Sequence, residues 1–258
     1  MNKKKMFDLV LTAVLMSIIL TMALVPNLGF ITIGVAAITL VHIPVLIGVL
    51  ILPLTNGVIL GATFGIGSLI SANIQATGPI DLAFQNPLYS VVPRVLFALC
   101  VGLIIKLIAH FIKKNKKVLL INQIVSIAII FGLLGMVGHY FGAQANGHEI
   151  LGMITGFSVA YLLITLVFWY VNQKDAKDYL SYGFLLITGT VIHTVLVIGF
   201  LLIFNSELIN QVFGGQNFID IYYAIISTNG ILEATFALLI GLPIIIAIVS
   251  NYKELKKI

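Results

Sequence analysis

The sequence has few charged side chains and one cysteine. Of its 258 residues, 9% are Asp, Glu, Lys or Arg and 60% are apolar. Soluble globular domains carry about 25% charged residues, so this composition excludes a soluble globule. The single Cys100 excludes an internal disulfide framework or a cysteine-based metal cluster, and its place within an apolar run predicts a packing role.

Catalytic and nucleotide-binding motifs are also missing. The sequence contains no P-loop, no Gly-x-Ser-x-Gly elbow and no His-Glu-x-x-His pair. His139 and His148 flank a glycine-containing turn, where a fixed metal-ligand geometry is not expected. We therefore predict no enzymatic activity, no bound metal and no cofactor in this chain.

Eight apolar stretches are long enough to cross a membrane as helices, because about 17–25 apolar residues span a hydrocarbon core about 30 Å thick. They lie near residues 7–25, 36–53, 56–73, 91–112, 118–142, 150–171, 180–204 and 228–250. We therefore predict an all-α polytopic membrane protein, with residues 1–258 forming a single integral membrane domain.

The lysine clusters fall on one side of the predicted membrane when the intervening loops are assigned to its two sides in turn. These residues are Lys3, Lys4, Lys5, Lys113, Lys114, Lys116, Lys117, Lys174, Lys177, Lys253, Lys256 and Lys257. Positive charge near span ends stays cytoplasmic, so we predict a plasma-membrane protein with both termini in the cytoplasm. The net charge of +5 then indicates attraction to inner-leaflet lipids, and it does not predict nucleic-acid binding.

Two segments on the opposite, outer side differ from ordinary loops. Residues 26–34 are strongly apolar, and Phe30, Thr32 and Gly34 alternate with isoleucines, which predicts a short extended segment or hairpin. Such backbone at membrane depth is tolerated where it is buried in protein or lines a cavity, so we expect a structured cap. Residues 71–90 are rich in amides and hydroxyls.

Ionisable side chains inside membranes are candidates for function, because their burial is costly. Arg94 lies where the fourth span leaves the outer surface; it can grip a ligand carboxylate with its planar fork, pair with Glu233, or reach a lipid headgroup. Glu233 and Asn229 are four residues apart and share a helix face that can bind a polar ligand. Asn229 can instead cap the start of that helix.

Two histidines lie near the same outer ends. His193 is mid-span between Thr190 and Thr194, which add hydroxyls on nearly the same face. It is either a ligand contact or a buried structural histidine. His42, near the outer end of the second span, joins the site or braces the outer cap.

Two stripes of small residues predict close approach between helices. Gly57, Gly61 and Gly65 are spaced four apart in the third span, and Ala13 and Ser17 have the same spacing in the first. Each stripe either packs inside the chain or docks a partner subunit.

Three groups of residues occur in a distinctive order along the chain. They are Thr39–Gly48 with Gly57–Gly65, then Asn86–Arg94, then Gly189–Val197 with Asn229–Glu233. In order and spacing they resemble the substrate-binding S component of energy-coupling factor (ECF) vitamin transporters, in the branch that binds pantothenate, folate and cobalamin. The resemblance covers about residues 7–112 and 180–250 and implies a six-helix core, into which residues 118–172 insert a two-helix transmembrane hairpin.

The resemblance implies a bacterial subunit that captures a vitamin from outside. Such a subunit then associates with a membrane coupling subunit and two cytoplasmic ATPases, which use the ATP. The substrate-binding residues it implies here are Phe30, Thr32, Gly34, Asn86, Arg94, His193, Asn229 and Glu233. The partner-docking residues are Ala13, Ser17, Gly57, Gly61 and Gly65.

The chain departs from that family in two places. His193 stands where relatives commonly have an asparagine between threonines, and Ala13 with Ser17 stands where relatives have an alanine pair. For the inserted hairpin we favour a lipid-facing brace over a widened ligand pocket, because it carries few polar groups.

We therefore predict a capture subunit with no catalysis of its own. Within the family branch that the sequence resembles, pantothenate is the preferred ligand, because it is a small anion that suits Arg94 with several amides and hydroxyls. Folate, cobalamin or another micronutrient are the alternatives. A self-sufficient proton-coupled carrier using His193 and Glu233 is the alternative function, but the inner halves of the spans are nearly wholly apolar. An intramembrane enzyme acting on lipid would need a nucleophile with a base or metal, which the sequence does not show.

Overall fold

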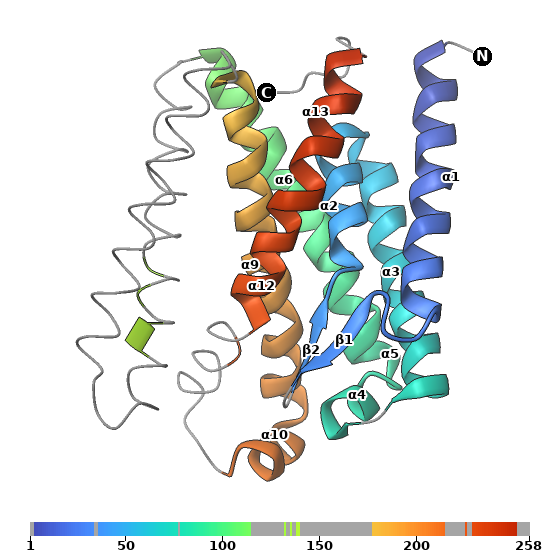
Figure 1. The fold of residues 1–258 in the computed structure, drawn as a ribbon, viewed down its shortest axis with the longest axis vertical. Helices are drawn as coiled ribbons and strands as arrows, with labels where there is room; N and C mark the ends of the chain where they lie inside the picture. The colour runs from blue at the N-terminus through green and yellow to red at the C-terminus, as the bar shows by residue number, and fades with distance from the viewer. Residues whose placement is uncertain are drawn as a thin grey trace.

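The computed structural model describes residues 3–33, 36–76, 78–114, 177–214 and 229–251, and the single residues 132, 135, 138, 139 and 225. Within these residues the chain is mostly helical, with one two-stranded sheet (Figure 1). The elements are α1 (Lys3–Leu24), β1 (Phe30–Ile33), β2 (Ala36–Thr39), α2 (His42–Ile51), α3 (Leu54–Gln75), α4 (Pro79–Ala83), α5 (Pro87–Ser90), α6 (Val92–Lys114), α9 (Lys177–Phe204), α10 (Ser206–Phe213), α12 (Ile231–Phe236), the π-helix η2 (Ala237–Gly241) and α13 (Leu242–Asn251).

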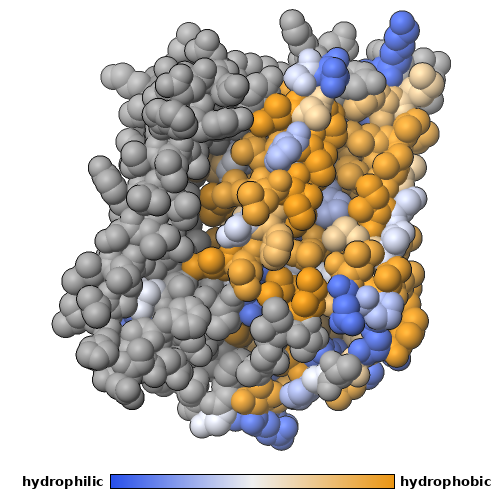
Figure 2. All heavy atoms as spheres, in the orientation of Figure 1, coloured by the Kyte–Doolittle hydropathy of each residue, from blue (hydrophilic) through white to orange (hydrophobic). Residues whose placement is uncertain are grey.

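Five helical stretches in the described part of the chain are long and apolar enough to cross a membrane. They are Lys3–Leu24, Leu54–Gln75, Pro87–Leu107, Tyr182–Phe204 and Ile231–Asn251. Figure 2 shows a broad apolar band across the visible face of the bundle, with hydrophilic side chains gathered toward its two ends. The protein is therefore a multi-pass membrane protein.

The predicted spans 118–142 and 150–171 lie outside the described residues, apart from four isolated positions. The inserted hairpin 118–172 and the total of eight spans therefore remain predictions.

The second predicted span, residues 36–53, is not one helix. Its first residues form β2, which pairs antiparallel with β1 so that Phe30 faces Thr39 and Ile33 faces Ala36. This confirms the extended hairpin expected after the first span and corrects the boundary of the second. The apolar run concealed the strand, because a buried strand and a buried helix segment have the same hydropathy.

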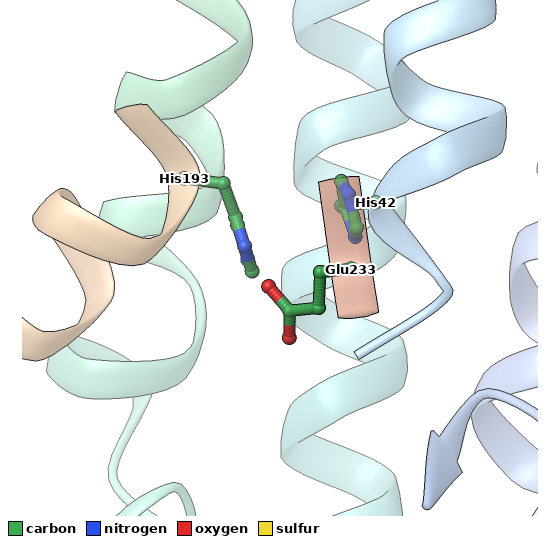
Figure 3. A group of neighbouring side chains, drawn as sticks. All are labelled: His42, His193 and Glu233. Carbon is green, nitrogen blue, oxygen red and sulfur yellow. The ribbon is translucent and has the colours of Figure 1, made fainter. Parts of the chain in front are cut away.

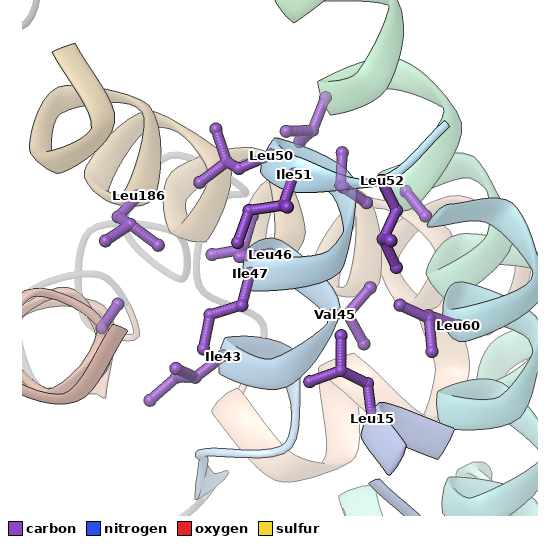
Figure 4. Close-up of a cluster of buried hydrophobic side chains, with 14 of the residues drawn as sticks. Leu15, Ile43, Val45, Leu46, Ile47, Leu50, Ile51, Leu52, Leu60 and Leu186 are labelled. Carbon is purple, nitrogen blue, oxygen red and sulfur yellow. The ribbon is translucent and has the colours of Figure 1, made fainter. Parts of the chain in front are cut away.

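Helix α2 occupies the centre of the bundle. All ten of its residues are buried, and Figure 4 shows its side chains surrounded by Leu15 of α1, Leu60 of α3 and Leu186 of α9. Because every face is covered, the helix has no polar side and no amphipathic periodicity. Ten residues rise about 15 Å, roughly half of a hydrocarbon core, so α2 alone does not span the membrane.

The two ends of the bundle differ in charge and structure. The start of α1, the end of α6, the start of α9 and the end of α13 lie at one end (Figure 1). The described residues there include Lys3–Lys5, Lys113, Lys114 and Lys177. The β1–β2 hairpin, α4 and α10 lie toward the other end.

Candidate functional site

A cavity of about 280 Å³ lies beside the β1–β2 hairpin. Residues of the hairpin, α3, α4, α6, α9 and α12 form its walls. Five of the eight predicted substrate-binding residues line it. They are Phe30, Arg94, His193, Asn229 and Glu233. The fold therefore brings together residues that are up to about two hundred positions apart in the sequence.

Arg94 projects from α6 into this cavity and is only 2% exposed. One terminal nitrogen donates to the backbone carbonyl of Tyr89, and the guanidinium carbon lies 4.5 Å from the centre of the Phe84 ring and 5.5 Å from that of Phe64. Its Nε has no hydrogen-bond partner among the described residues. Because its side chain is buried at the cavity, Arg94 is poorly placed to reach a lipid headgroup, and its open donor suits an anionic ligand inside the cavity.

Glu233 ties α12 to two other elements. Its Oε1 accepts a hydrogen bond from the backbone N–H of Thr39 at 2.7 Å, and its Oε2 accepts from the Thr194 hydroxyl at 3.3 Å. Arg94 lines the same cavity, but among the described contacts no hydrogen bond joins it to Glu233. The predicted internal pair is therefore not a direct one, and space for a ligand adjoins both charges.

His42 is held on both sides by hydrogen bonds. Its Nδ1 lies 2.7 Å from the carbonyl oxygen of Thr39, and its Nε2 lies 3.1 Å from the hydroxyl oxygen of Thr190. A carbonyl only accepts, so Nδ1 carries the hydrogen. The Thr190 hydroxyl donates to the carbonyl of Leu186 at 3.0 Å, and its oxygen is the partner of Nε2. Thr39 thus binds His42 through its carbonyl and Glu233 through its N–H, which anchors the end of β2 to the bundle.

His193 is enclosed by aromatic rings. It stacks on His42 with ring centres 5.1 Å apart, meets Phe97 edge-on at 5.1 Å, and lies 5.5 Å from the ring centre of Phe64. It is 3% exposed, yet neither ring nitrogen has a hydrogen-bond partner in the described part of the chain. Buried polar groups in folded proteins are nearly always hydrogen-bonded. We therefore expect a ligand in the cavity that His193 lines to supply its hydrogen-bond partner.

Three potential metal-donor groups meet here. Donor atoms of His42, His193 and Glu233 lie within 4.8 Å of one another, and Figure 3 shows the Glu233 carboxylate directed toward the His193 ring. Both nitrogens of His42 and both carboxylate oxygens of Glu233 already have partners. The stacked imidazole planes are 6° apart, so their in-plane lone pairs lie in parallel planes and do not converge on one ion. This geometry favours a hydrogen-bonding cluster over a metal centre.

Of the other three predicted binding residues, the structure describes the side chain of Asn86 alone, and Asn86 is not among the residues that line the cavity. The side chain of Asn86 accepts a hydrogen bond from the backbone N–H of Leu88 at 2.9 Å and caps the start of α5, which gives it a local structural role. The backbone of Thr32 lies in β1, but its side chain and all of Gly34 lie outside what the structure describes. Asn229, one of the five lining residues, is buried at the cavity wall. It is not the N-cap of α12, because that position is occupied by Gly230.

The glycine stripe of α3 packs inside the chain. Gly57, Gly61 and Gly65 are all buried. A Cβ atom on Gly61 would lie 2.6 Å from the Cβ of Ala98, and one on Gly65 would lie 2.7 Å from the Cα of Val91. These glycines are needed for the approach of neighbouring helices, so the prediction that they dock a partner is corrected to packing within the chain.

The stripe of α1 is different, because it faces outward. Ala13 and Ser17 are exposed, and the Ser17 hydroxyl donates to the carbonyl of Ala13 at 3.0 Å. Val14 and Ile18 beside them are 49% and 42% exposed. This face remains available to lipid or to a partner.

Several lining residues were not among the predicted ones. Ser68, Ser71 and Gln75 follow one face of α3, and their spacing of three and four was visible in the sequence. The small serines resemble the helix-packing positions beside them, which conceals their polar role. Phe84 gives no sequence signal, because its contact with Arg94 exists only in the folded chain.

Comparison with known proteins gives a partial match. No protein-family model matches the sequence. The chain is similar to the pantothenate transporter PanT of Leuconostoc mesenteroides subsp. mesenteroides, with 32% identity over 107 residues. The similar region makes up 40% of this chain and 52% of that protein, so the chain spans about half the length of the curated relative it matches.

Proposed function

We propose that this chain captures pantothenate, as the binding subunit of an ECF-type importer. The observation that carries the proposal is the cavity beside the hairpin, where one buried arginine with an open donor lies with two acidic residues, Asp81 and Glu233, and several neutral hydrogen-bonding groups. The partial similarity to a pantothenate transporter supports the same ligand.

The chemistry of pantothenate matches the lining. The molecule has one carboxylate, one amide, two hydroxyls and a pair of methyl groups. Arg94 offers a charged fork, Asn229 and Thr194 offer neutral polar groups, and Val197 and Ile198 offer apolar surface. A cavity of about 280 Å³ lies just below the usual range of ligand sites, which is about 300 to 1,000 Å³. That size favours pantothenate over folate and the far larger cobalamin.

The proposed site faces the outside of the cell. The cavity lies beside the hairpin, whereas the described lysines at helix ends lie at the other end of the bundle. Positive charge near membrane-spanning segments is retained in the cytoplasm. A site on the outer side with cytoplasmic termini is the arrangement that capture from the medium requires.

In this proposal energy comes from partner proteins. The printed sequence contains no P-loop, and the chain itself performs no catalysis. A coupling subunit would dock on the exposed face of α1 around Ala13 and Ser17, and two ATPases bound to that subunit would hydrolyse the ATP.

Transport by proteoliposomes tests the proposal against the proton-coupled carrier. Vesicles holding the chain alone should bind radiolabelled pantothenate on their outer face and accumulate none. Vesicles that also hold an ECF coupling subunit and its ATPases should accumulate it when ATP is enclosed. Accumulation by the chain alone under a proton gradient would instead establish the carrier.

A further inference from the structure

Glu233 and His42, which lie beside His193, have their own hydrogen-bond partners, whereas His193 has none among the described residues. Glu233 bonds Thr39 and Thr194, and His42 bonds Thr39 and Thr190. Both nitrogens of His193 lack a partner within the described residues. A neutral imidazole has one donor and one acceptor, and leaving both unbonded in a buried site is costly.

Packing holds the His193 ring in place. His42 covers one face, Phe97 approaches edge-on, and Phe64 lies nearby at an angle of 33°. The ring also lines the cavity. A molecule in the cavity can therefore reach a polar edge that is already oriented by its neighbours.

The position of Glu233 disfavours an anion as the hydrogen-bond partner of His193. Donor atoms of His193 and Glu233 lie within 4.8 Å of each other, so a ligand carboxylate at His193 would meet the Glu233 carboxylate. The guanidinium of Arg94, which lies against Phe84, can instead form charge-assisted hydrogen bonds with a ligand carboxylate. A ligand hydroxyl can both donate and accept a hydrogen bond. It can therefore accept from the N–H of the His193 imidazole and donate to the neighbouring Glu233 carboxylate.

We propose that the site recognises its ligand at two chemically distinct ends, with the carboxylate at Arg94 and a hydroxyl at His193. This inference rests on the proposed function. For pantothenate it places the carboxylate end of the molecule at α6 and the hydroxyl-bearing pantoyl end between α9 and α12. His193 then determines specificity for the hydroxyls, and His42 is a positioning residue behind it.

Calorimetric titration of the full chain in lipid nanodiscs tests this orientation. Three ligands are compared: pantothenate, pantothenyl alcohol, which lacks the carboxylate, and a deoxy analogue with both pantoyl hydroxyls replaced by hydrogen. The unaltered chain should bind each analogue about 10- to 100-fold more weakly than pantothenate. His193→Phe keeps an aromatic ring and should reduce the preference over the deoxy analogue to a few-fold, while preserving the preference over pantothenyl alcohol. Arg94→Gln should do the reverse.

The outcomes separate the two proposals. If the unaltered chain binds pantothenate and the deoxy analogue equally, the role of the hydroxyls is overturned without any variant, whether or not His193→Phe folds. An unchanged preference over the deoxy analogue in folded His193→Phe overturns the assignment of His193. If the unaltered chain binds no pantothenate, the proposed function itself fails.

Discussion

The backbone N–H of Thr39 donates a 2.7 Å hydrogen bond to Oε1 of Glu233, a residue 194 positions away in the sequence. This bond fastens the end of the β1–β2 hairpin to the last membrane helix at the edge of the cavity. Thr39 is 8% exposed and Glu233 is 4% exposed, so water does not readily replace either partner. The hairpin is thus positioned by a residue that also lines the proposed binding site.

Glu233→Ala should loosen the hairpin. The substitution leaves the buried Thr39 N–H without its acceptor, at a cost of about 1–3 kcal/mol. Hydrogen exchange of a peptide covering residues 30–39 should become faster. Glu233→Gln retains an oxygen that can accept the bond, so its exchange should change less. Equal exchange in all three proteins would show that the bond does not hold the hairpin.

Arg94→Gln should weaken pantothenate binding without unfolding the protein. Hydrogen bonds to charged groups contribute about 1.5–3 kcal/mol, which corresponds to roughly a 10- to 150-fold loss of affinity. Arg94→Lys keeps the charge and loses the planar contact with Phe84, so we expect an intermediate loss. Titration calorimetry measures both, and unchanged affinity in Arg94→Gln would remove this residue from the site.

His42→Phe should lower stability and, through His193, affinity. A phenyl ring preserves the stack on His193 but removes the bonds to the Thr39 carbonyl and to Thr190. Thermal unfolding should show a loss of about 1–3 kcal/mol for the buried carbonyl left without a donor. Thr190→Val removes only one of the two bonds of His42, so it should destabilise less. A His42→Phe protein as stable as the unaltered one would contradict the bracing role.

Gly61→Ala should destabilise the chain. The new methyl group would overlap Ala98 and a backbone oxygen of α6, and overpacking of this kind costs about 1–3 kcal/mol. Ala13→Leu places a larger group on the exposed face of α1, where we expect no loss of melting temperature. Comparison of the two melting curves distinguishes packing within the chain from an open surface.

The same open surface is the proposed contact with the coupling subunit. Ala13→Leu and Ser17→Leu should leave pantothenate affinity unchanged, because both side chains are exposed and neither lines the cavity. Co-purification with the coupling subunit should be lost, since the larger side chains keep a partner helix at a distance. Intact complexes containing both substitutions would place the docking surface elsewhere.

The sequence predicts some features of this fold well. Alternation around Phe30 and Thr32 predicts the hairpin, and the length of the apolar runs predicts the long helices that the structure describes. The sequence does not reveal that residues 36–39, at the start of the second predicted span, form a strand and not the first turn of a helix. Helix α2 is buried on every side, so its sequence has no periodicity that could mark where it begins.

The site is predictable only in part, for a related reason. An ionisable residue within an apolar run is easily recognised in a sequence. Arg94, His193 and Glu233 can be identified as candidate site residues because burying such groups in a membrane is energetically costly. Serines on α3 do not stand out, because small residues also serve helix packing. The stacking of His42 on His193 joins residues from two distant helices, and a single sequence contains no record of that contact.

The most direct measurement is the binding of pantothenate to the purified chain alone, in parallel with Arg94→Gln. The account predicts one molecule bound per chain without any partner protein, and a binding curve for the variant shifted roughly 10- to 150-fold to higher concentration. Saturable binding that is the same in both proteins would place the ligand away from the cavity. No binding by the unaltered chain would contradict capture of pantothenate altogether.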